Sequence, residues 1–357
     1  MKSILAPAVL AALSLAAVPA RSAEPAPAKA GCAPMGGLNF VCGPKHAEDL
    51  QVLPGGRWLI ASGMAEGGGL HLVDVRTKAW RRWIAPAGAK PDARFPGCTA
   101  PPDPERFSAQ GLSLHPRAGG GARLYVVGHG ARESIEVFDI AAGAEPSLAW
   151  AGCVLMPDKL VANSVAATPD GAIYATVMLL PGKTMADSLA GKPTGTVLEW
   201  RPGQDGFHAI KGTELATDNG IEASADGKTL YVVSSGGRSV TAFDRASWRK
   251  LGSAQISGFT PDNVHWGPGG KLYAAGMTDD EPACGGPPHL VNGRVDLTGC
   301  PRGYQVATID PKTMKAKLLV KGPAVPVYTG TATALPAGGN LWISSFATDR
   351  IAYRPAP

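Results

Sequence analysis

A repeated strand pattern constrains this chain more than any other feature of its sequence. Residues 214–245 show it most clearly, because alternating runs at 221–225, 229–234 and 239–243 are separated by Asp-Gly and Gly-Gly pairs. Such pairs between runs of period two are strong hairpin signals, since type I′ turns need the positive φ that glycine adopts without a Cβ clash. This segment is therefore predicted to form a meander of three strands.

The same pattern recurs along the chain in one register. Counting back six residues from the residue before each turn reaches an equivalent position in each segment, and five of the six positions carry a side-chain oxygen. These positions are Glu48, Gln110, Asn163, Asn219, Asp262 and Gly330. Six meanders of four short strands, stacked radially, close into a ring. We therefore expect an all-β fold over residues 42–357, a six-bladed β-propeller with four-stranded blades.

In such a ring the first strand of each blade lines the central channel, so residues at one repeat position converge near the axis. Glu48, Asn163, Asn219 and Asp262, with Asn263 beside the last, would bring two carboxylates and three amide carbonyls together. Hard oxygen ligands in this number suit Ca²⁺ better than zinc, which prefers nitrogen and sulfur. We predict one axial calcium ion held by these five residues. The alternative is that polar residues at strand starts cap a wet channel.

The beginning of the chain reads as a targeting segment. Residues 1–23 contain Lys2, an apolar run over 4–18 and then small residues, which is typical of a secretory signal peptide and too short and Ala-rich for a membrane-spanning helix. Residues 24–41 are expected to form a leader segment. We therefore expect a secreted or periplasmic protein with no membrane span.

The charge distribution argues against polyanionic partners. The formal net charge is +5, it would fall by two on removal of Lys2 and Arg21, and the basic residues are scattered. A chain without a block of like charges is not expected to bind nucleic acid or an anionic membrane. We expect a small-molecule substrate and infer no obligate protein partner.

The six cysteines of an exported chain are expected to be oxidised. Six cysteines allow fifteen pairings. The closure of local loops suggests Cys32 with Cys42 and Cys284 with Cys300, which leaves Cys98 with Cys153. Two long connections, residues 87–107 and 278–303, are candidate covers of the channel mouth.

Several motifs together carry a resemblance to known propellers. They are EDLQVLPGG, FSAQGLSLHP, LYVVGHGARESIEVFDI, NSVAATPDG, DNGIEASADGKTLYV and DNVHWGPGG. With them the chain resembles the serum paraoxonase/arylesterase family and, more distantly, the gluconolactonase and strictosidine synthase propellers. The resemblance implies a six-bladed propeller that holds a catalytic and a structural calcium ion and hydrolyses lactones and aryl esters.

Residue by residue, the resemblance implies the same five ligands for the catalytic calcium. At the structural calcium, Asp49 is present but Ser164 stands where the family has aspartate, which puts a second ion near Asp49 in doubt. In the family's Phe-x-x-His-Gly motif, Gln110 stands where the family has its proposed histidine base. The second histidine of the family matches His129.

The glutamine changes what the site can do. Glutamine accepts no proton at neutral pH, so Gln110 could orient a water molecule but not deprotonate it. We predict Gln110 and His129 as catalytic residues, with His129 assisting proton transfer; Asp262 or a calcium-bound hydroxide are alternative bases. The sequence has no Gly-x-Ser-x-Gly elbow, which disfavours a serine hydrolase.

The function expected from these features is a calcium-dependent hydrolase of lactones or aryl esters. The alternative is a non-catalytic, calcium-stabilised propeller that binds a ligand or a partner protein. Condensation chemistry of the strictosidine synthase type is a third option, for which no residue argues specifically.

Overall fold

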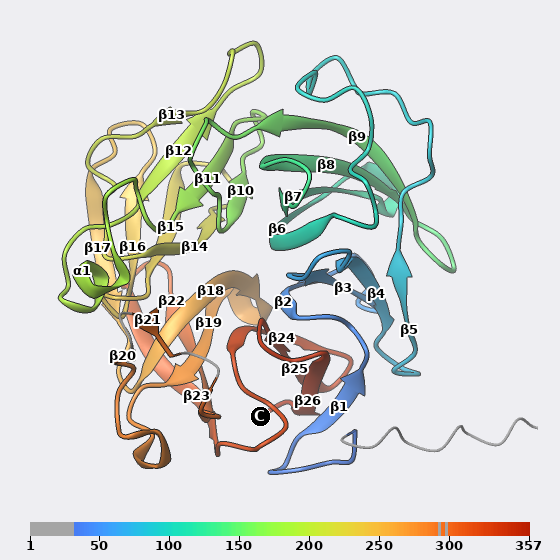
Figure 1. Cartoon of the computed structure of the whole chain (residues 1–357). Helices are drawn as coiled ribbons and strands as arrows, with labels where there is room; N and C mark the ends of the chain where they lie inside the picture. The colour runs from blue at the N-terminus through green and yellow to red at the C-terminus, as the bar shows by residue number, and fades with distance from the viewer. Residues whose placement is uncertain (1–31, 292–293, 297–298) are drawn as a thin grey trace, which may run out of the picture.

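The computed structural model describes residues 32–291, 294–296 and 299–357, and its strands form a ring of six four-stranded antiparallel sheets around a central axis (Figure 1). The predicted six-bladed β-propeller is confirmed. In order from the axis outward, blade 1 contains β2 (Ala47–Val52), β3 (Trp58–Gly63), β4 (Gly69–Asp74) and β5 (Trp80–Trp83). Blade 2 contains β6 (Ser108–Pro116), β7 (Ala122–His129), β8 (Ser134–Ala141) and β9 (Ser147–Leu155).

The next blades follow the same order from the axis outward. Blade 3 contains β10 (Val165–Ala167), β11 (Ile173–Val177), β12 (Thr196–Trp200) and β13 (His208–Ala209). Blade 4 contains β14 (Asp218–Ala223), β15 (Thr229–Ser234), β16 (Ser239–Asp244) and β17 (Lys250–Gln255). Blade 5 contains β18 (Phe259–Gly267), β19 (Lys271–Thr278), β22 (Tyr304–Asp310) and β23 (Lys315–Gly322).

Blade 6 is built from both ends of the described chain. It contains β24 (Thr331–Ala337), β25 (Asn340–Ser345), β26 (Arg350–Pro355) and, on its outer edge, β1 (Asn39–Cys42). Residues 39–41, which the sequence reading assigned to the leader segment, thus lie in a strand of the propeller. The predicted signal peptide and residues 24–31 lie outside the described residues.

The blades adhere through six apolar clusters, one at each junction between neighbouring blades. Successive residues of a strand face opposite sides of the sheet, so each strand serves two junctions. In β3, for example, Leu59 and Ala61 face blade 6 while Ile60 faces blade 2. Both faces of most sheets are therefore buried, which explains the long apolar runs in the inner strands.

The two predicted turns of blade 4 form, but the glycines play different parts. Gly227 has a φ of +68°, but Asp226 has no positive φ, so the Asp-Gly pair forms part of a four-residue loop and not the expected type I′ turn. At the second turn the positive φ belongs to Arg238, at +47°, and not to Gly236 or Gly237. A Cβ on Gly236 would lie 2.3 Å from Ser188 Oγ, so glycine is needed there for close packing against the neighbouring helix α1 (Met185–Leu189).

The three predicted disulfides, Cys32–Cys42, Cys98–Cys153 and Cys284–Cys300, are all present. Cys98–Cys153 fixes the connection 87–107 to the outer strand β9, where Gly97 N–H donates to the Cys153 carbonyl oxygen at 3.1 Å. The expectation that this whole connection covers the channel mouth is therefore wrong for its middle part. It runs along the edge of blade 2 because its backbone finds hydrogen-bond partners there.

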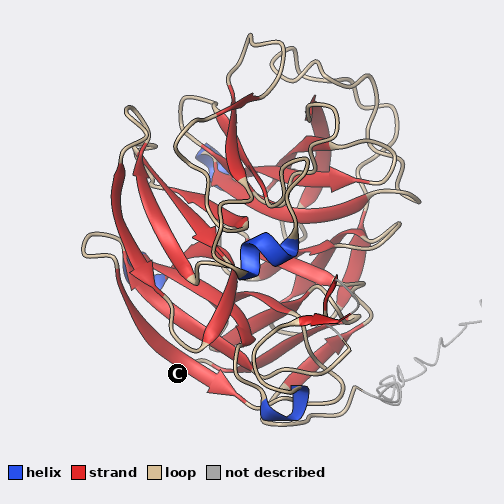
Figure 2. Ribbon diagram, turned by 60° about the vertical axis from the view of Figure 1, so that its left-hand side comes forward, coloured by secondary structure: helices blue, strands red, loops and turns tan. Residues whose placement is uncertain are grey.

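The insertion in blade 5 lies beside helix α1. It contains a short hairpin of β20 (Leu290–Val291) and β21 (Arg294–Val295), and β21 contacts α1. Figure 2 brings this side of the ring forward and shows the helix and the loops around it. No helix within the described part of the chain is long and apolar enough to cross a membrane.

Candidate metal and catalytic site

The predicted metal ligands lie where the inner strands change register. The ladder between the first two strands of a blade is interrupted at Ala47/Leu50, Asp218/Ile221 and Pro261/Val264. The residues inside these interruptions are Glu48, Asn219 and the pair Asp262 and Asn263. A β-bulge bends the strand and redirects side chains, so the same irregularity in several blades turns polar groups toward the axis.

Close approach of neighbouring inner strands supports this arrangement. A Cβ on Gly220 would lie 2.7 Å from Asn263 Cα, so only glycine permits the approach of β14 to β18 at this level. Hydroxyl groups then tie bulges of different blades together. Thr176 Oγ1 donates to the Asn219 carbonyl oxygen at 2.6 Å, and Ser344 Oγ donates to the Glu48 carbonyl oxygen at 2.6 Å.

The bulge positions correct one point of the sequence register. In blade 6 the interruption lies between Thr331 and Ala334, so Ala332 and not Gly330 is the equivalent of Glu48. The two positions differ because the inner strand of blade 6 runs further before its turn at Gly338. The expectation that blade 6 offers no side-chain oxygen at the first bulge position still stands, since alanine carries none.

Four of the five predicted ligands carry a buried oxygen without a hydrogen-bond partner among the described residues. These atoms are Glu48 Oε2, Asn163 Oδ1, Asn219 Oδ1 and Asn263 Oδ1. The four residues are between 1% and 6% exposed. Buried polar atoms are almost always paired, so four unpaired acceptors on the inner strands of four blades require an explanation.

The amide nitrogens of the three asparagines are all occupied, which fixes the oxygens as the free atoms. Asn263 Nδ2 donates to Glu48 Oε1 at 2.7 Å and Asn219 Nδ2 donates to Ser235 Oγ at 3.0 Å. Asn163 Nδ2 lies 2.9 Å from Met178 Sδ, a weak acceptor. The chain therefore presents unpaired acceptors at this place, which is the character of a site for a hard cation.

The carboxyl groups of the cluster repel one another. Burial raises the pKa of Glu48 well above its usual value, and the charges of Asp49 and Asp262 raise it further. Burial also raises the pKa of Asp262 to about 7, against a hydrogen bond from Asn219 that lowers it. A bound cation would offset both effects, because it favours the ionised form of each carboxyl. The donor set and its electrostatics thus fit a divalent cation bound by oxygen.

Asp49 belongs to a different network from the unpaired oxygens. Its Oδ1 accepts from Thr333 Oγ1 at 2.6 Å and lies 2.7 Å from His265 Nε2, while its Oδ2 accepts from the Leu112 N–H at 2.7 Å. Burial lowers the pKa of His265, but Asp49 and Glu222 outweigh it and raise that pKa to about 10. Both Asp49 oxygens are thus engaged by protein groups, which argues against a second metal ion beside this carboxylate.

The two predicted catalytic residues contact each other. His129 Nε2 lies 2.9 Å from Gln110 Oε1, and His129 Nδ1 lies 2.6 Å from Glu133 Oε2. The sequence reading missed Glu133, although its spacing of four residues after His129 across a short turn is a usable signal. A carboxylate at Nδ1 favours a proton on that nitrogen, while the Gln110 oxygen occupies Nε2, so Nε2 can accept a proton only where the Gln110 amide turns away from it.

A second group of potential metal ligands has another explanation. Cys98, Glu136 and Cys153 lie close enough to share an ion. The two cysteines form a disulfide, and the Glu136 oxygens accept from Arg132 Nε at 2.7 Å and Trp150 Nε1 at 2.7 Å. These atoms are already satisfied, so we assign the group a structural part in blade 2.

A small cavity of about 80 Å³ opens beside the axial oxygens. Asn219 and Asp262 line it together with apolar side chains from blades 3 to 6, helix α1 and the blade 5 insertion. These apolar residues are Met178, Met185, Leu189, Pro261, Met277, Pro288, Val295 and Phe346. We call this space the mouth pocket. The insertion contributes to it through Pro288 and Val295, as expected for a cover of the channel.

Comparisons with known proteins agree with this architecture. The structure resembles that of a gluconolactonase from Xanthomonas campestris with a TM-score of 0.51 and 16% identity, covering 90% of this chain and 89% of that one. It also resembles a candidate gluconolactonase with a TM-score of 0.50 and 13% identity, covering 89% and 91%. At these identities the likeness establishes the fold alone. No curated protein matches the sequence.

The sequence itself matches a family. The SMP-30/gluconolactonase/LRE-like region matches residues 62–280, more than half of the chain, and the expected resemblance to gluconolactonase propellers is confirmed. Gluconolactonases act on small molecules, in keeping with the expected kind of substrate. The matched range includes Gln110, His129 and every predicted ligand except Glu48, which precedes it. The chain is a lactonase-type propeller and belongs to the SMP-30/gluconolactonase/LRE-like family.

Proposed function

We propose that this chain is an exported, calcium-dependent hydrolase of lactones or aryl esters. The observation that carries the proposal is the set of four buried, unpaired oxygens on the inner strands of four blades, of which Asn219, with the nearby Asp262, lines the mouth pocket. Glu48, Asn163, Asn219 and Asn263 would hold the ion through these oxygens, and Asp262 would supply a further carboxylate. Calcium is the common cation that accepts this many oxygen ligands.

A calcium ion, when bound, supplies a Lewis acid that polarises an ester carbonyl and stabilises negative charge on its oxygen. The chain's own residues supply the proton transfer. Glu133 favours a proton on His129 Nδ1, so Nε2 of His129 would accept a proton from the attacking water once Gln110 Oε1, 2.9 Å from it, has turned away. The Gln110 amide, turned toward that water, would orient it, since the amide has both a donor and an acceptor.

The mouth pocket favours substrates with apolar substituents. Apart from the predicted ligands Asn219 and Asp262, several of its polar side chains are already engaged: Ser188 with Thr217, Thr260 with Asp279 at 2.5 Å, and Arg238 with the same carboxylate at 2.5 Å. Hydroxyl groups of a sugar would find few free partners there, and buried unpaired hydroxyls are unfavourable. An alkyl or aryl group would instead pack on the methionine and phenylalanine side chains.

Export is part of the proposal because of two features. The residues before the described chain read as a signal peptide, and the three disulfides suggest an extracellular or periplasmic environment.

Hydrolysis assays with purified protein test the catalytic proposal. The panel contains an alkyl-substituted lactone, a phenyl ester and a sugar lactone, and each is measured before chelation, after chelation and with calcium restored. We expect turnover that chelation abolishes and calcium restores, with the sugar lactone as the poorest substrate. Turnover that is the same with and without chelator would refute the calcium requirement.

A matched pair of variants tests the metal site separately from activity. Asn219→Ala should lower calcium affinity and the melting temperature together, because a ligand that binds only the native state stabilises it. Asn340→Ala in β25, whose Nδ2 donates to Gly338 at an exposed turn, should change neither. Equal calcium content in both variants would refute the axial calcium site.

The rival reading is a non-catalytic propeller in which the ion serves stability. Gln110 in place of a histidine is the observation that favours it. Calcium binding without turnover of any substrate in the panel would support this rival.

A further inference from the structure

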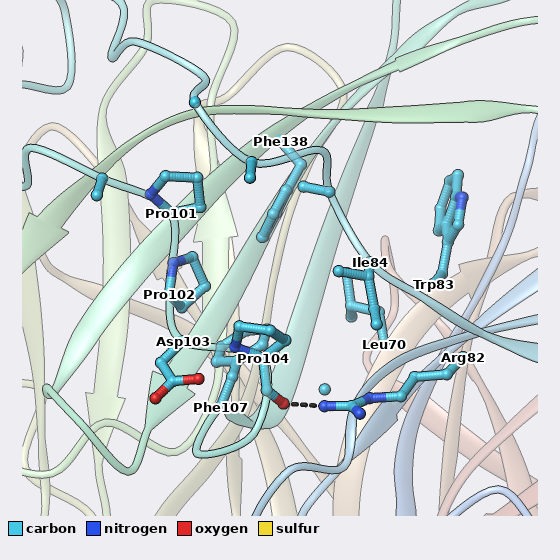
Figure 3. Close-up of a pocket in the computed structure, with 15 residues that line it drawn as sticks. Leu70, Arg82, Trp83, Ile84, Pro101, Pro102, Asp103, Pro104, Phe107 and Phe138 are labelled. Carbon is cyan, nitrogen blue, oxygen red and sulfur yellow. Dashed lines mark hydrogen bonds between the residues drawn. The ribbon is translucent and has the colours of Figure 1, made fainter.

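A larger cavity lies between blades 1 and 2 (Figure 3). Its volume is about 390 Å³, within the ~300–1,000 Å³ common for small-molecule pockets. Residues of β4, β5, β8 and the connection 84–107 line it, and its lining includes none of the predicted metal ligands, nor His129 or Gln110. The mouth pocket shares no lining residue with it. We call it the interblade pocket.

The walls of the interblade pocket are apolar. Pro101 and Pro102 face Leu70 and Ile84 across the space, and Phe138 lies above them in Figure 3. Leu70 and Phe138 are 2% exposed and belong to the apolar cluster between the two blades. Ile84 at the rim is 51% exposed, so the fold leaves a large apolar side chain in contact with solvent here. An apolar ligand would gain free energy by covering these surfaces.

The cover of the interblade pocket is held in place on both sides. The disulfide Cys98–Cys153 ties the connection to β9, and Arg82 Nη2 donates to the Pro104 carbonyl oxygen. A pocket that is already shaped costs little ordering on binding.

The pocket lining offers a buried donor without a hydrogen-bond partner in the described part of the chain, the Arg82 Nε–H group. Arg82 Nη1 donates to Glu105 Oε1 at 3.0 Å and Nη2 is taken by Pro104, but Nε is buried and has no hydrogen-bond partner among the described residues. A buried donor without a partner costs free energy that an acceptor on a ligand would recover.

The charges around the pocket disfavour an anionic ligand. Arg82 contributes one positive charge, while Asp103 in the lining and Glu105 beside the guanidinium contribute two negative charges. An anion would gain from Arg82 and lose to both carboxylates. We propose that the interblade pocket binds a neutral, largely apolar small molecule whose single hydrogen-bond acceptor meets the Arg82 Nε–H group.

Titration of the calcium-loaded protein with nonan-2-one tests this proposal, with nonanoate as the charged molecule of the same chain length. Methyl NMR reports where the ketone binds, because Ile84 lies at the interblade pocket and Met277 lines the mouth pocket. We expect saturable shifts of the Ile84 methyl groups with the ketone and weaker ones with nonanoate. Shifts confined to Met277, or no saturable shift, would overturn the proposal, as would tighter binding of nonanoate.

Two pairs of variants separate binding from folding. Arg82→Met should weaken ketone binding about tenfold, the usual worth of a hydrogen bond to a charged group, while Arg81→Met on the exposed side of β5 should not. Ala87→Trp should block the rim, with Ala144→Trp in an exposed loop as its control. If Arg82→Met does not melt cooperatively, the ketone affinity of Ala87→Trp tests the site instead. Unchanged ketone binding in Ala87→Trp would refute the proposed site. Lactonase assays do not enter this test, so its outcome is independent of the proposed reaction.

Discussion

Stability should fall in mild acid because of one buried histidine. His71 in β4 is 2% exposed, its ring centroid lies 5.4 Å from that of Trp80, and its Nε2 accepts from the Lys45 N–H at 3.4 Å. Burial lowers the pKa of His71 from 6.5 to about 4. The folded protein therefore keeps this ring neutral at a pH where the unfolded chain takes up a proton.

The sign and size of the effect follow from the two pKa values. Stability is fully present above pH 6.5 and is lost as the pH falls from 6.5 toward 4, because over that window the unfolded state binds more protons. Between pH 8 and pH 5 the free energy of unfolding should drop by about 2 kcal/mol from this group alone, with a limit of about 3 kcal/mol at lower pH.

Urea unfolding at pH 5, 6, 7 and 8, with calcium in excess, measures this loss. His71→Phe should shift stability by a constant amount and remove about 2 kcal/mol of the difference between pH 8 and pH 5. His208→Phe, at an exposed histidine of β13, serves as the control. Parallel loss of stability in the parent protein and in His71→Phe would show that His71 is not held neutral by burial, and the reasoning would fail.

Three further perturbations test other parts of the structure. Glu133→Gln should lower kcat by up to roughly 10²-fold with little change in KM, because the base loses its orientation; an unchanged pH–rate profile would contradict this. Replacing both Cys32 and Cys42 by alanine should lower the free energy of unfolding in urea by about 2–3 kcal/mol, because the disulfide closes a loop with a sequence separation of 10. An unchanged free energy of unfolding would mean that the loop is ordered without the disulfide. His265→Leu should lower the free energy of unfolding by about 3–5 kcal/mol in the same assay, because it leaves the buried Asp49 carboxylate without its charged partner. Adding Asp49→Asn should recover part of that loss. Equal stability of the single and double variants would argue against an interaction between His265 and Asp49.

The parts of the structure that a sequence can predict are those set by local chemistry. The hairpin around Asp226 and Gly227 forms because a few neighbouring residues specify the loop, with Ser224 Oγ accepting from the Lys228 and Thr229 N–H groups. The axial register is also readable, since Glu48 and Asn219 hold equivalent places in a repeated pattern. Equivalent positions of a repeat lie close together in a closed ring, so the sequence alone can predict that residues far apart along the chain are neighbours in space.

The features that sequence reasoning missed depend on partners far along the chain. His265 contacts Asp49 across 216 residues, and no local pattern announces that pair. The path of the connection 87–107 depends on free backbone groups along β9, which become visible only once blade 2 is assembled. The unpaired Arg82 Nε likewise depends on tertiary packing, because the sequence alone does not distinguish Arg82 from the adjacent Arg81.

The composite sixth blade sets an order of events during synthesis. β1 leaves the ribosome first among the strands, yet its neighbour β26 is made last. Until then Phe40 and Val41 have no partner strand, although they form part of the apolar clusters on both sides of blade 6. Until blade 6 is completed by the pairing of β1 with β26, the ring is therefore open and blades 1 and 5 each expose a sheet face. A chaperone that shields blades 1 and 5 at that stage would protect the step at which this fold is most exposed to aggregation.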